Sequence, residues 1–302
     1  MSASMAFLCI IWGFNFVIMK SGNDAFPPVL FAALRFLTGA LVLFSVSFMK
    51  KIPSPNKVDL KWYVLCGVLQ TTYFNIAIQI SLNHVSAGLT SVLTYSMPLF
   101  LSLMAHKWIP GEQLTVKKAL GIVLGIAGLF IAMDIHLGGS SWAVLLALSS
   151  AISWAAANLI FKLKLKHCNT IQYTTWQMAI GAAGLWIYSL SFEHGEAHWG
   201  LMPVFYILFS GIVASALAFV MWNHILSRTE ASKAAISLLL VPVVGVISGY
   251  LFLDENLKIV TLAGILLVLT GIWIVNSKSS NTSPGVESNV VNKSVRLNPP
   301  EF

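Results

Sequence analysis

Apolar residues fill this chain in long runs, which short polar segments separate. Runs of about 20 apolar residues are typical of helices that cross a membrane, because lipid leaves each backbone N–H and C=O to find a partner within its own helix. The runs occupy residues 3–20, 28–49, 61–81, 86–106, 115–133, 141–162, 172–192, 202–224, 231–253 and 258–276. They predict an all-α polytopic membrane protein with ten transmembrane helices.

The second half of the chain repeats the first. An offset of 142 residues aligns Trp12 with Trp154 and Lys20 with Lys162. Further aligned pairs, at offsets of 142 to 144, are Arg35 with Gln177, Pro98 with Pro242 and Glu112 with Glu255. A chain of two similar halves of hydrophobic helices is the usual plan of a secondary transporter, which holds its substrate between the halves.

Each half contains five of the runs, an odd number, so the second half enters the membrane upside down relative to the first. The chain is therefore expected to form two inverted five-helix repeats, 1–134 and 135–276. Residues 277–302, rich in Ser, Asn and Pro, are expected to form a disordered cytoplasmic tail. Inverted symmetry offers two equivalent arrangements, one open to each side of the membrane.

Composition and charge agree with a membrane protein. The chain is 57% hydrophobic and 10% charged, with a mean hydropathy of +0.80, whereas soluble domains carry roughly 25% charged residues. If the N-terminus is inside, all the basic residues except Lys20, Arg35 and Lys258 fall in inner loops or the tail. The positive-inside rule accounts for the net charge of +7 without a nucleic-acid partner and places both termini in the cytoplasm.

Two prolines lie in the middle of apolar runs at equivalent positions, Pro98 and Pro242. A proline removes a helix hydrogen bond and crowds the carbonyl four residues back. Paired Pro-interrupted helices point to a transporter's binding site, so both are candidate hinges. A pair of purely structural kinks is the alternative.

Glycines in the runs 115–133 and 258–276 indicate helix packing rather than a hinge. Gly121, Gly125 and Gly128 in the first run, with Gly264 and Gly271 in the second, have the small-xxx-small spacing that lets helices pack closely. The two runs are therefore predicted to form scaffold.

Polar and aromatic side chains inside the runs are candidates for a cavity wall. Asn15 and Asn158 lie one turn beyond Trp12 and Trp154, away from the interfacial belt where tryptophan usually anchors a helix. Thr72, Asn75 and Gln79 share one helix face, and amides in hydrocarbon are costly unless they are satisfied. Interhelical hydrogen bonding and packing are the alternatives. The predicted substrate-binding residues are Trp12, Asn15, Asn75, Gln79, Tyr95, Trp154 and Asn158.

Arg35 is the charge deepest within an apolar run. It could bind a substrate carboxylate, or it could pair with backbone carbonyls and hold its helix in place. The structural role is slightly favoured, because Gln177 replaces Arg35 in the other half.

All eleven acidic residues map to loops, ends of runs or the tail. A pump that exchanges organic cations for protons needs a buried carboxylate, so cation extrusion is disfavoured and the coupling ion stays open. Cys9, Cys66 and Cys168 have neither CxxC nor zinc-ligand spacing, so no metal site and no cofactor is expected.

Two sets of residues resemble the EamA-type members of the drug/metabolite transporter superfamily. They are Trp12, Gly13, Asn15, Lys20, Pro27, Pro28, Arg35 and Phe36 near the start, and Ser237, Pro242, Gly245, Leu253, Asp254 and Glu255 near the end. The chain is especially similar to the exporters of cysteine and O-acetylserine within that group. The resemblance implies ten spans, cytoplasmic termini, a central cavity and export of amino acids or related metabolites.

The expected function is export of small amino acids or related metabolites across the inner (plasma) membrane by alternating access. Export of hydrophobic drugs or aromatic compounds is the alternative within the transporter class. A polytopic membrane enzyme is less favoured, because the chain has no HExxH or GxSxG motif and no carboxylate pair within a run. The expected partners are a small-molecule substrate and the lipid bilayer, and the oligomeric state stays open.

Overall fold

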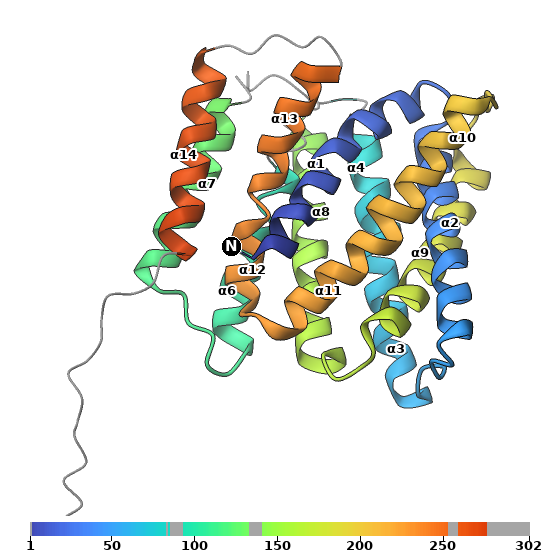
Figure 1. The fold of residues 1–302 in the computed structure, drawn as a ribbon, viewed down its shortest axis with the longest axis horizontal. Helices are drawn as coiled ribbons and strands as arrows, with labels where there is room; N and C mark the ends of the chain where they lie inside the picture. The colour runs from blue at the N-terminus through green and yellow to red at the C-terminus, as the bar shows by residue number, and fades with distance from the viewer. Residues whose placement is uncertain (1, 83, 85–92, 133–140, 253–258, 277–302) are drawn as a thin grey trace, which may run out of the picture.

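The computed structural model describes residues 2–82, 84, 93–132, 141–252 and 259–276, and these residues form helices and short connections without any strand. The helices stand side by side in a bundle (Figure 1). Within the described part of the chain, six helices are long and apolar enough to cross a membrane: Ala3–Asn23, Pro28–Met49, Lys57–Ser81, Ser141–Leu165, Leu201–Arg228 and Ala231–Phe252. The predicted class, an all-α membrane protein, is therefore confirmed in outline.

The helices follow the apolar runs closely. In the first half they are α1 (Ala3–Asn23), α2 (Pro28–Met49), α3 (Lys57–Cys66), η1 (Gly67–Tyr73), α4 (Phe74–Leu82), α6 (Met97–Trp108) and α7 (Val116–Ala132). In the second half they are α8 (Ser141–Ile160), η2 (Phe161–Leu165), α9 (Thr170–Phe192), α10 (Leu201–Leu208), η3 (Phe209–Leu217), α11 (Ala218–Arg228), α12 (Ala231–Ser237), α13 (Leu240–Phe252) and α14 (Ile259–Asn276). The predicted tail 277–302 and the first part of the run 86–106 lie outside the described residues.

Three long helices change their winding part of the way along. The segments η1, η2 and η3 are π-helical and continue directly into or out of α-helix. A π turn bonds residue i to i+5 and is commonly found at functional sites. Nothing in the apolar pattern indicated these segments.

Both predicted hinge prolines follow a break in the helix. Residues 95–96 and 238–239 form turns, so neither proline lies within an unbroken helix: α6 begins at Met97, and the run 231–253 consists of the separate helices α12 and α13. Pro98 lies in the first turn of α6 and Pro242 in the first turn of α13. A proline there removes no helical hydrogen bond, because the first N–H groups have no partner within the helix.

Helices α7 and α14 pack through their glycines, as the spacing predicted. A Cβ atom on Gly271 would lie 2.7 Å from the carbonyl oxygen of Gly121, and one on Gly128 would lie 2.7 Å from that of Gly264. Contacts this close require glycine. As residue numbers rise along α7 they fall along α14, so the two helices run antiparallel.

The equivalent helices α2 and α9 also run antiparallel. At one end, the backbone N–H of Val29 donates to the carboxylate of Glu193, at 2.7 Å, just beyond the end of α9. Towards the other end, Ser47 Oγ lies 3.4 Å from Thr175 Oγ1. Helix α1 packs along α13, and α6 packs along α8.

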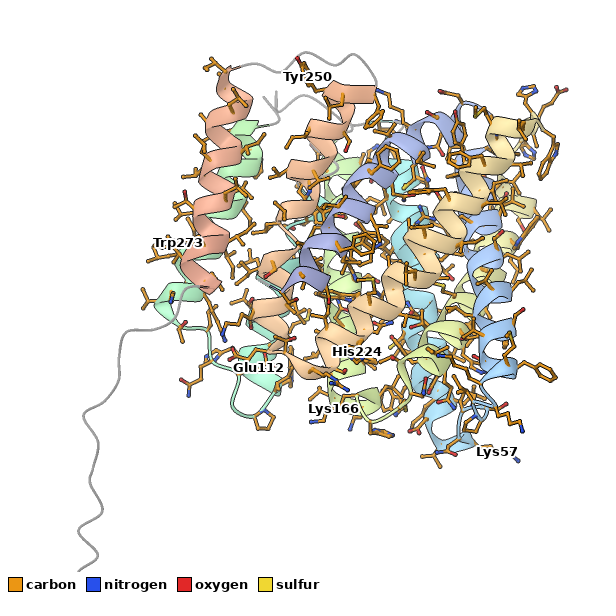
Figure 2. All side chains as sticks on the ribbon, in the orientation of Figure 1. Lys57, Glu112, Lys166, His224, Tyr250 and Trp273 are labelled. Atoms are coloured by element: carbon orange, nitrogen blue, oxygen red, sulfur yellow. The ribbon has the colours of Figure 1, made fainter. Side chains whose placement is uncertain are left out.

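Charged side chains lie at one end of the bundle, where Lys57, Glu112 and Lys166 are found with His224 (Figure 2). Tyr250 lies at the opposite end (Figure 2). Along the outside of the bundle many large apolar side chains are exposed, among them Leu266 at 65% and Trp273 at 70%. An apolar exterior, with charged side chains collected at an end of the bundle, suits a protein surrounded by lipid.

Candidate functional site

Two tryptophans that are equivalent in the repeat meet inside the bundle. The ring centroids of Trp12 in α1 and Trp154 in α8 are 6.0 Å apart, with ring planes inclined by 72°. Phe219 and Trp222 of α11 lie 5.3 and 6.2 Å from Trp12, and Phe74 of α4 lies 5.2 Å from Trp154. All of these pairs except Trp12–Trp222 are edge-to-face, an arrangement that adds to the stabilisation from burial. We call these five rings the central aromatic cluster; it joins helices from both halves.

Asn15 and Trp12 both bond to the π-helical segment η3. The indole Nε1 of Trp12 donates to the carbonyl of Ala214 at 2.9 Å. One turn further along α1, Asn15 accepts a hydrogen bond of 2.7 Å from Ser210 Oγ. Both predicted residues are buried, and their bonds hold α1 against η3 at two levels.

Asn158 bonds to the central aromatic cluster itself. Its Oδ1 atom accepts a hydrogen bond of 3.0 Å from the indole Nε1 of Trp222, and its Nδ2 atom lies 3.9 Å from the sulfur of Met97. Asn158 is therefore an internal partner of an aromatic ring rather than a free amide.

Tyr95 lies in the break that precedes α6. Its ring centroid is 5.9 Å from that of Trp154, with the planes inclined by 80°. The indole Nε1 of Trp154 is buried and has no hydrogen-bond partner among the described residues. The central aromatic cluster thus contains one N–H group, that of Trp154, with no acceptor among the described residues.

Arg35 and Asn75 are brought together, one from α2 and one from α4. Arg35 Nη2 donates to Asn75 Oδ1 at 3.3 Å, while Asn75 Nδ2 donates to the carbonyl of Thr71 at 2.7 Å. The guanidinium carbon of Arg35 lies 4.5 Å from the centroid of the Phe36 ring. The Phe36 ring in turn lies 5.9 Å from that of Phe219, so Arg35 borders the cluster.

Gln79 has a different setting from the other predicted residues. Its Nε2 atom donates to the carbonyl of Pro28 at 3.3 Å, and its Oε1 atom accepts from Asn23 at 3.4 Å. These partners lie at the end of α1 and the start of α2, so Gln79 links helix ends. Thr72, on the same predicted face, donates to the carbonyl of Gly181 at 3.0 Å.

The sequence analysis did not identify Phe219 and Trp222 as candidate site residues. The run 202–224 put Trp222 at its end, where a tryptophan is typical of an interfacial anchor. In the structure the helix continues to Arg228, and Trp222 is fully buried. Their i, i+3 spacing, which puts both rings on one helix face, was the available signal.

An ion cluster lies at the end of the bundle that carries Glu112. The Glu112 carboxylate accepts a hydrogen bond of 2.9 Å from the backbone N–H of Ala231, the first residue of α12. Lys162 Nζ lies 3.9 Å from Glu112 Oε1 and donates to the carbonyls of Leu226 and Thr229. Glu112 therefore satisfies the start of α12 and balances a largely buried lysine. Glu255, its counterpart in the repeat, lies outside the described residues.

A pocket of about 330 Å³ opens beside this cluster. Its lining includes Lys117, Lys118, Glu230 and Lys233. Lys118 Nζ lies 2.6 Å from Glu230 Oε2, and this hydrogen bond lowers the pKa of the Glu230 carboxyl below its ordinary value. The lining comes from helix ends and loops, so the pocket is separate from the central aromatic cluster.

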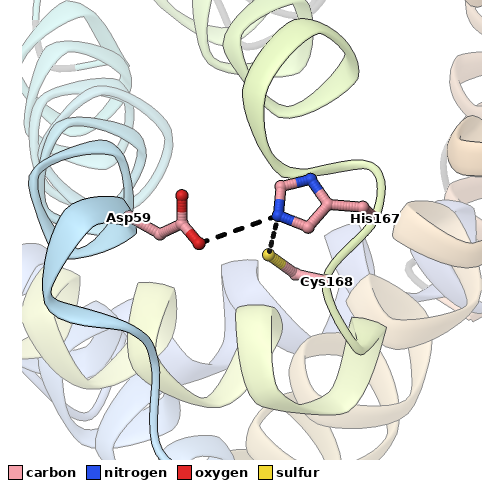
Figure 3. A group of neighbouring side chains, drawn as sticks. All are labelled: Asp59, His167 and Cys168. Carbon is pink, nitrogen blue, oxygen red and sulfur yellow. Dashed lines mark hydrogen bonds and ion pairs between the residues drawn. The ribbon is translucent and has the colours of Figure 1, made fainter.

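Asp59, His167 and Cys168 form a group of potential metal ligands that the sequence did not suggest. His167 Nε2 lies 3.7 Å from Asp59 Oδ2 and 3.5 Å from Cys168 Sγ (Figure 3). Asp59 is far from the other two in sequence, so no spacing motif could reveal the group. Burial raises the pKa of the Cys168 thiol, which disfavours the thiolate that a metal ion requires.

Known proteins resemble this chain along most of its length. An uncharacterized transporter of Bacillus subtilis (strain 168), YoaV, is 34% identical over 271 residues, which cover 88% of this chain and 92% of that protein. A probable amino-acid metabolite efflux pump of Escherichia coli (strain K12) is 29% identical over 279 residues, with coverage of 88% and 91%.

A solved crystal structure shares the fold. It matches with a TM-score of 0.76 at 18% sequence identity and covers 90% of this chain and 95% of that chain. The sequence profile of the EamA-like transporter family matches residues 2–133 and again residues 141–277. The resemblance found in the sequence is therefore confirmed, and the chain belongs to the EamA-like transporter family of the drug/metabolite transporter superfamily.

Proposed function

We propose that the protein is a secondary transporter that exports small amino acids or related metabolites across the inner (plasma) membrane by alternating access. The meeting of Trp12 and Trp154, which are equivalent in the repeat, is the observation that carries this proposal. A substrate held between two similar halves must contact equivalent residues from both, and the central aromatic cluster is built in that way. The name of the Escherichia coli relative supports amino-acid metabolites as the substrate class.

The proposed topology is ten transmembrane helices in two inverted five-helix repeats, 1–134 and 135–276, with both termini cytoplasmic. The antiparallel packing of α2 with α9 and of α7 with α14 supports it. Equivalent helices run in opposite directions when the second repeat is inverted, and in the same direction when it is not. The reciprocal pairs, α1 with α13 and α6 with α8, suit a two-fold relation between the halves.

The proposed movement bends the chain at the breaks before Pro98 and Pro242. Each break lacks continuous helical hydrogen bonding, and each adjoins the interior: Tyr95 in the first break contacts Trp154. Bending at equivalent breaks would exchange an opening on one side of the bundle for an opening on the other. The proposed binding wall comprises Trp12, Asn15, Asn75, Tyr95, Trp154 and Asn158, and Gln79 lies towards one of its ends.

Counterflow in liposomes tests the proposal. Purified protein is reconstituted into vesicles loaded with unlabelled cysteine, O-acetylserine or another amino acid, and uptake of the labelled compound is followed. Saturable uptake that depends on internal substrate is the expected result. If folded, correctly inserted protein exchanges none of these compounds, the amino-acid assignment is wrong.

Export of aromatic or hydrophobic compounds is a second candidate function. The five rings of the central aromatic cluster favour it, because stacked and edge-to-face ring contacts suit a flat apolar ligand. Competition separates the two candidates: an aromatic dye that is exchanged in the presence of excess amino acid would support the second.

A further inference from the structure

Arg35 carries a positive charge in the interior of the bundle. Only 7% of its surface is exposed, and it lies about two turns from the start of α2. A charged side chain at such a depth is costly in a membrane protein and usually has a partner or a function.

The described neighbours of Arg35 leave the charge unbalanced. Its Nη2 atom bonds to the neutral amide of Asn75, and the Phe36 ring contacts the guanidinium carbon. Its Nε and Nη1 atoms are buried without a hydrogen-bond partner among the described residues. The amide of Asn75 and the ring of Phe36 lower the free energy cost of burying the guanidinium, but neither carries a negative charge.

In the other half of the chain, a neutral side chain holds the equivalent helix. Gln177 occupies this position in α9 and donates from Nε2 to Thr71 Oγ1 at 3.4 Å. Arg35 bonds to Asn75, one turn beyond Thr71, so both residues tie their helices to the same stretch of chain. A neutral amide performs that role for α9. The guanidinium of Arg35 therefore offers something more than a link between helices.

Three buried donors in this part of the interior have no hydrogen-bond partner among the described residues: the Nε and Nη1 groups of Arg35 and the indole Nε1 of Trp154. The Oε1 atom of Gln177 is an unpartnered acceptor, but an amide oxygen carries no full negative charge. Tyr95 packs its ring on Trp154, and Arg35 borders the same central aromatic cluster through Phe36 and Phe219. A set of donors that includes a cation is complementary to an anion with two acceptor oxygens.

We propose that Arg35 binds the carboxylate of the transported compound, with Trp154 and Tyr95 beside it. The site then selects compounds that carry a free carboxylate and rejects their neutral amides and esters. This inference rests on the proposed function, since it names the chemical group by which that transporter recognises its substrate.

The test compares matched compounds in the counterflow assay. Unlabelled cysteine, its carboxamide and its methyl ester compete with labelled cysteine for uptake, and N-acetylcysteine serves as the compound that keeps the carboxylate and loses the amine charge. We expect the acid and its N-acetyl derivative to compete, and the amide and ester to compete at least about tenfold more weakly, since one charged contact is worth roughly that factor.

Variants assign the preference to Arg35. Arg35→Gln copies the residue of the other half and should reduce the acid-to-amide ratio to near one. Arg228→Gln removes an exposed arginine and should leave the ratio unchanged. Elution as a single peak on gel filtration establishes folding. If Arg35→Gln does not fold, Arg35→Lys, which keeps the charge without the planar fork, should lower the ratio several-fold.

The outcomes separate the two proposals. If wild-type protein exchanges cysteine but does not distinguish acid from amide, or if Arg35→Gln retains the preference, the carboxylate role is overturned and the amino-acid transporter stands. If the wild-type protein exchanges neutral aromatic compounds and no amino acid, both proposals are overturned.

Discussion

The carboxylate of Glu112 lies against the first backbone N–H of α12, at 2.9 Å from the nitrogen of Ala231. An acidic side chain from the first half of the chain thus accepts a hydrogen bond from the start of a helix of the second half. The same carboxylate faces Lys162, so a single substitution would affect both a helix start and a buried charge.

We expect Glu112→Ala to destabilise the protein by about 2–4 kcal/mol, because it exposes the start of α12 and leaves Lys162 without its counter-charge. Glu112→Gln should have a smaller effect, since an amide oxygen still accepts a hydrogen bond. Thermal unfolding in detergent measures the difference. Glu196→Gln, an exposed acidic residue, is the control, and equal losses in both variants would contradict this role for Glu112.

A second expectation concerns pH. The hydrogen bond from Lys118 lowers the pKa of Glu230 in the folded state. The Lys118–Glu230 ion pair therefore stabilises the protein fully at pH values above the unfolded-state pKa of glutamate, about 4.3. That contribution is lost as the pH falls through the lower, folded-state pKa. Glu230 is 46% exposed, so solvent limits the effect to about 1 kcal/mol or less.

The measurement compares unfolding temperatures of wild-type protein and Glu230→Gln between pH 6 and pH 3. The wild type should be slightly more stable at pH 6, and the gap should close towards pH 3. A gap that widens as the pH falls would mean that the ion pair does not act in this way.

Substitution of the buried asparagines should affect transport more than folding. We expect Asn15→Ala and Asn158→Ala each to lower the rate of exchange at least about tenfold, with a smaller loss of folded protein. Asn158 bonds to Trp222 of the central aromatic cluster, and Asn15 holds α1 against η3 one turn from Trp12. Ser210→Ala removes only the partner of Asn15 and should have an intermediate effect. Equal losses of transport and of folded protein would indicate a packing role.

Close packing of α7 and α14 provides a fourth test. Gly271→Ala places a methyl group 2.7 Å from the carbonyl oxygen of Gly121, so we expect a loss of about 1–3 kcal/mol in stability. At Gly200 the nearest atom to such a methyl group is 3.5 Å away, which makes Gly200→Ala the matched control. Similar unfolding temperatures for the two variants would contradict the close contact.

The sequence predicted those features that lipid and the repeat impose directly. Helices follow the apolar runs because buried backbone groups must bond within their own helix. Trp12 and Trp154 could be paired in advance because the repeat marks them. The partner of Asn158 could not, because Trp222 has no counterpart in the first half. Asp59 and Cys168 meet only through tertiary packing, which no local pattern records.

The π-helical segment η1 gives this part of the chain room for a change in length. A π turn holds one residue more than an α turn, so the extra residue is absorbed within the turn. Deleting one residue between Gly67 and Tyr73 would let the segment wind as α-helix and leave the residues beyond it in nearly their present orientation. The same deletion within an α-helix would rotate the two sides by about 100° relative to each other. A single-codon deletion in η1 is therefore expected to keep Asn75 on the side of Arg35, although the helix would be one residue shorter.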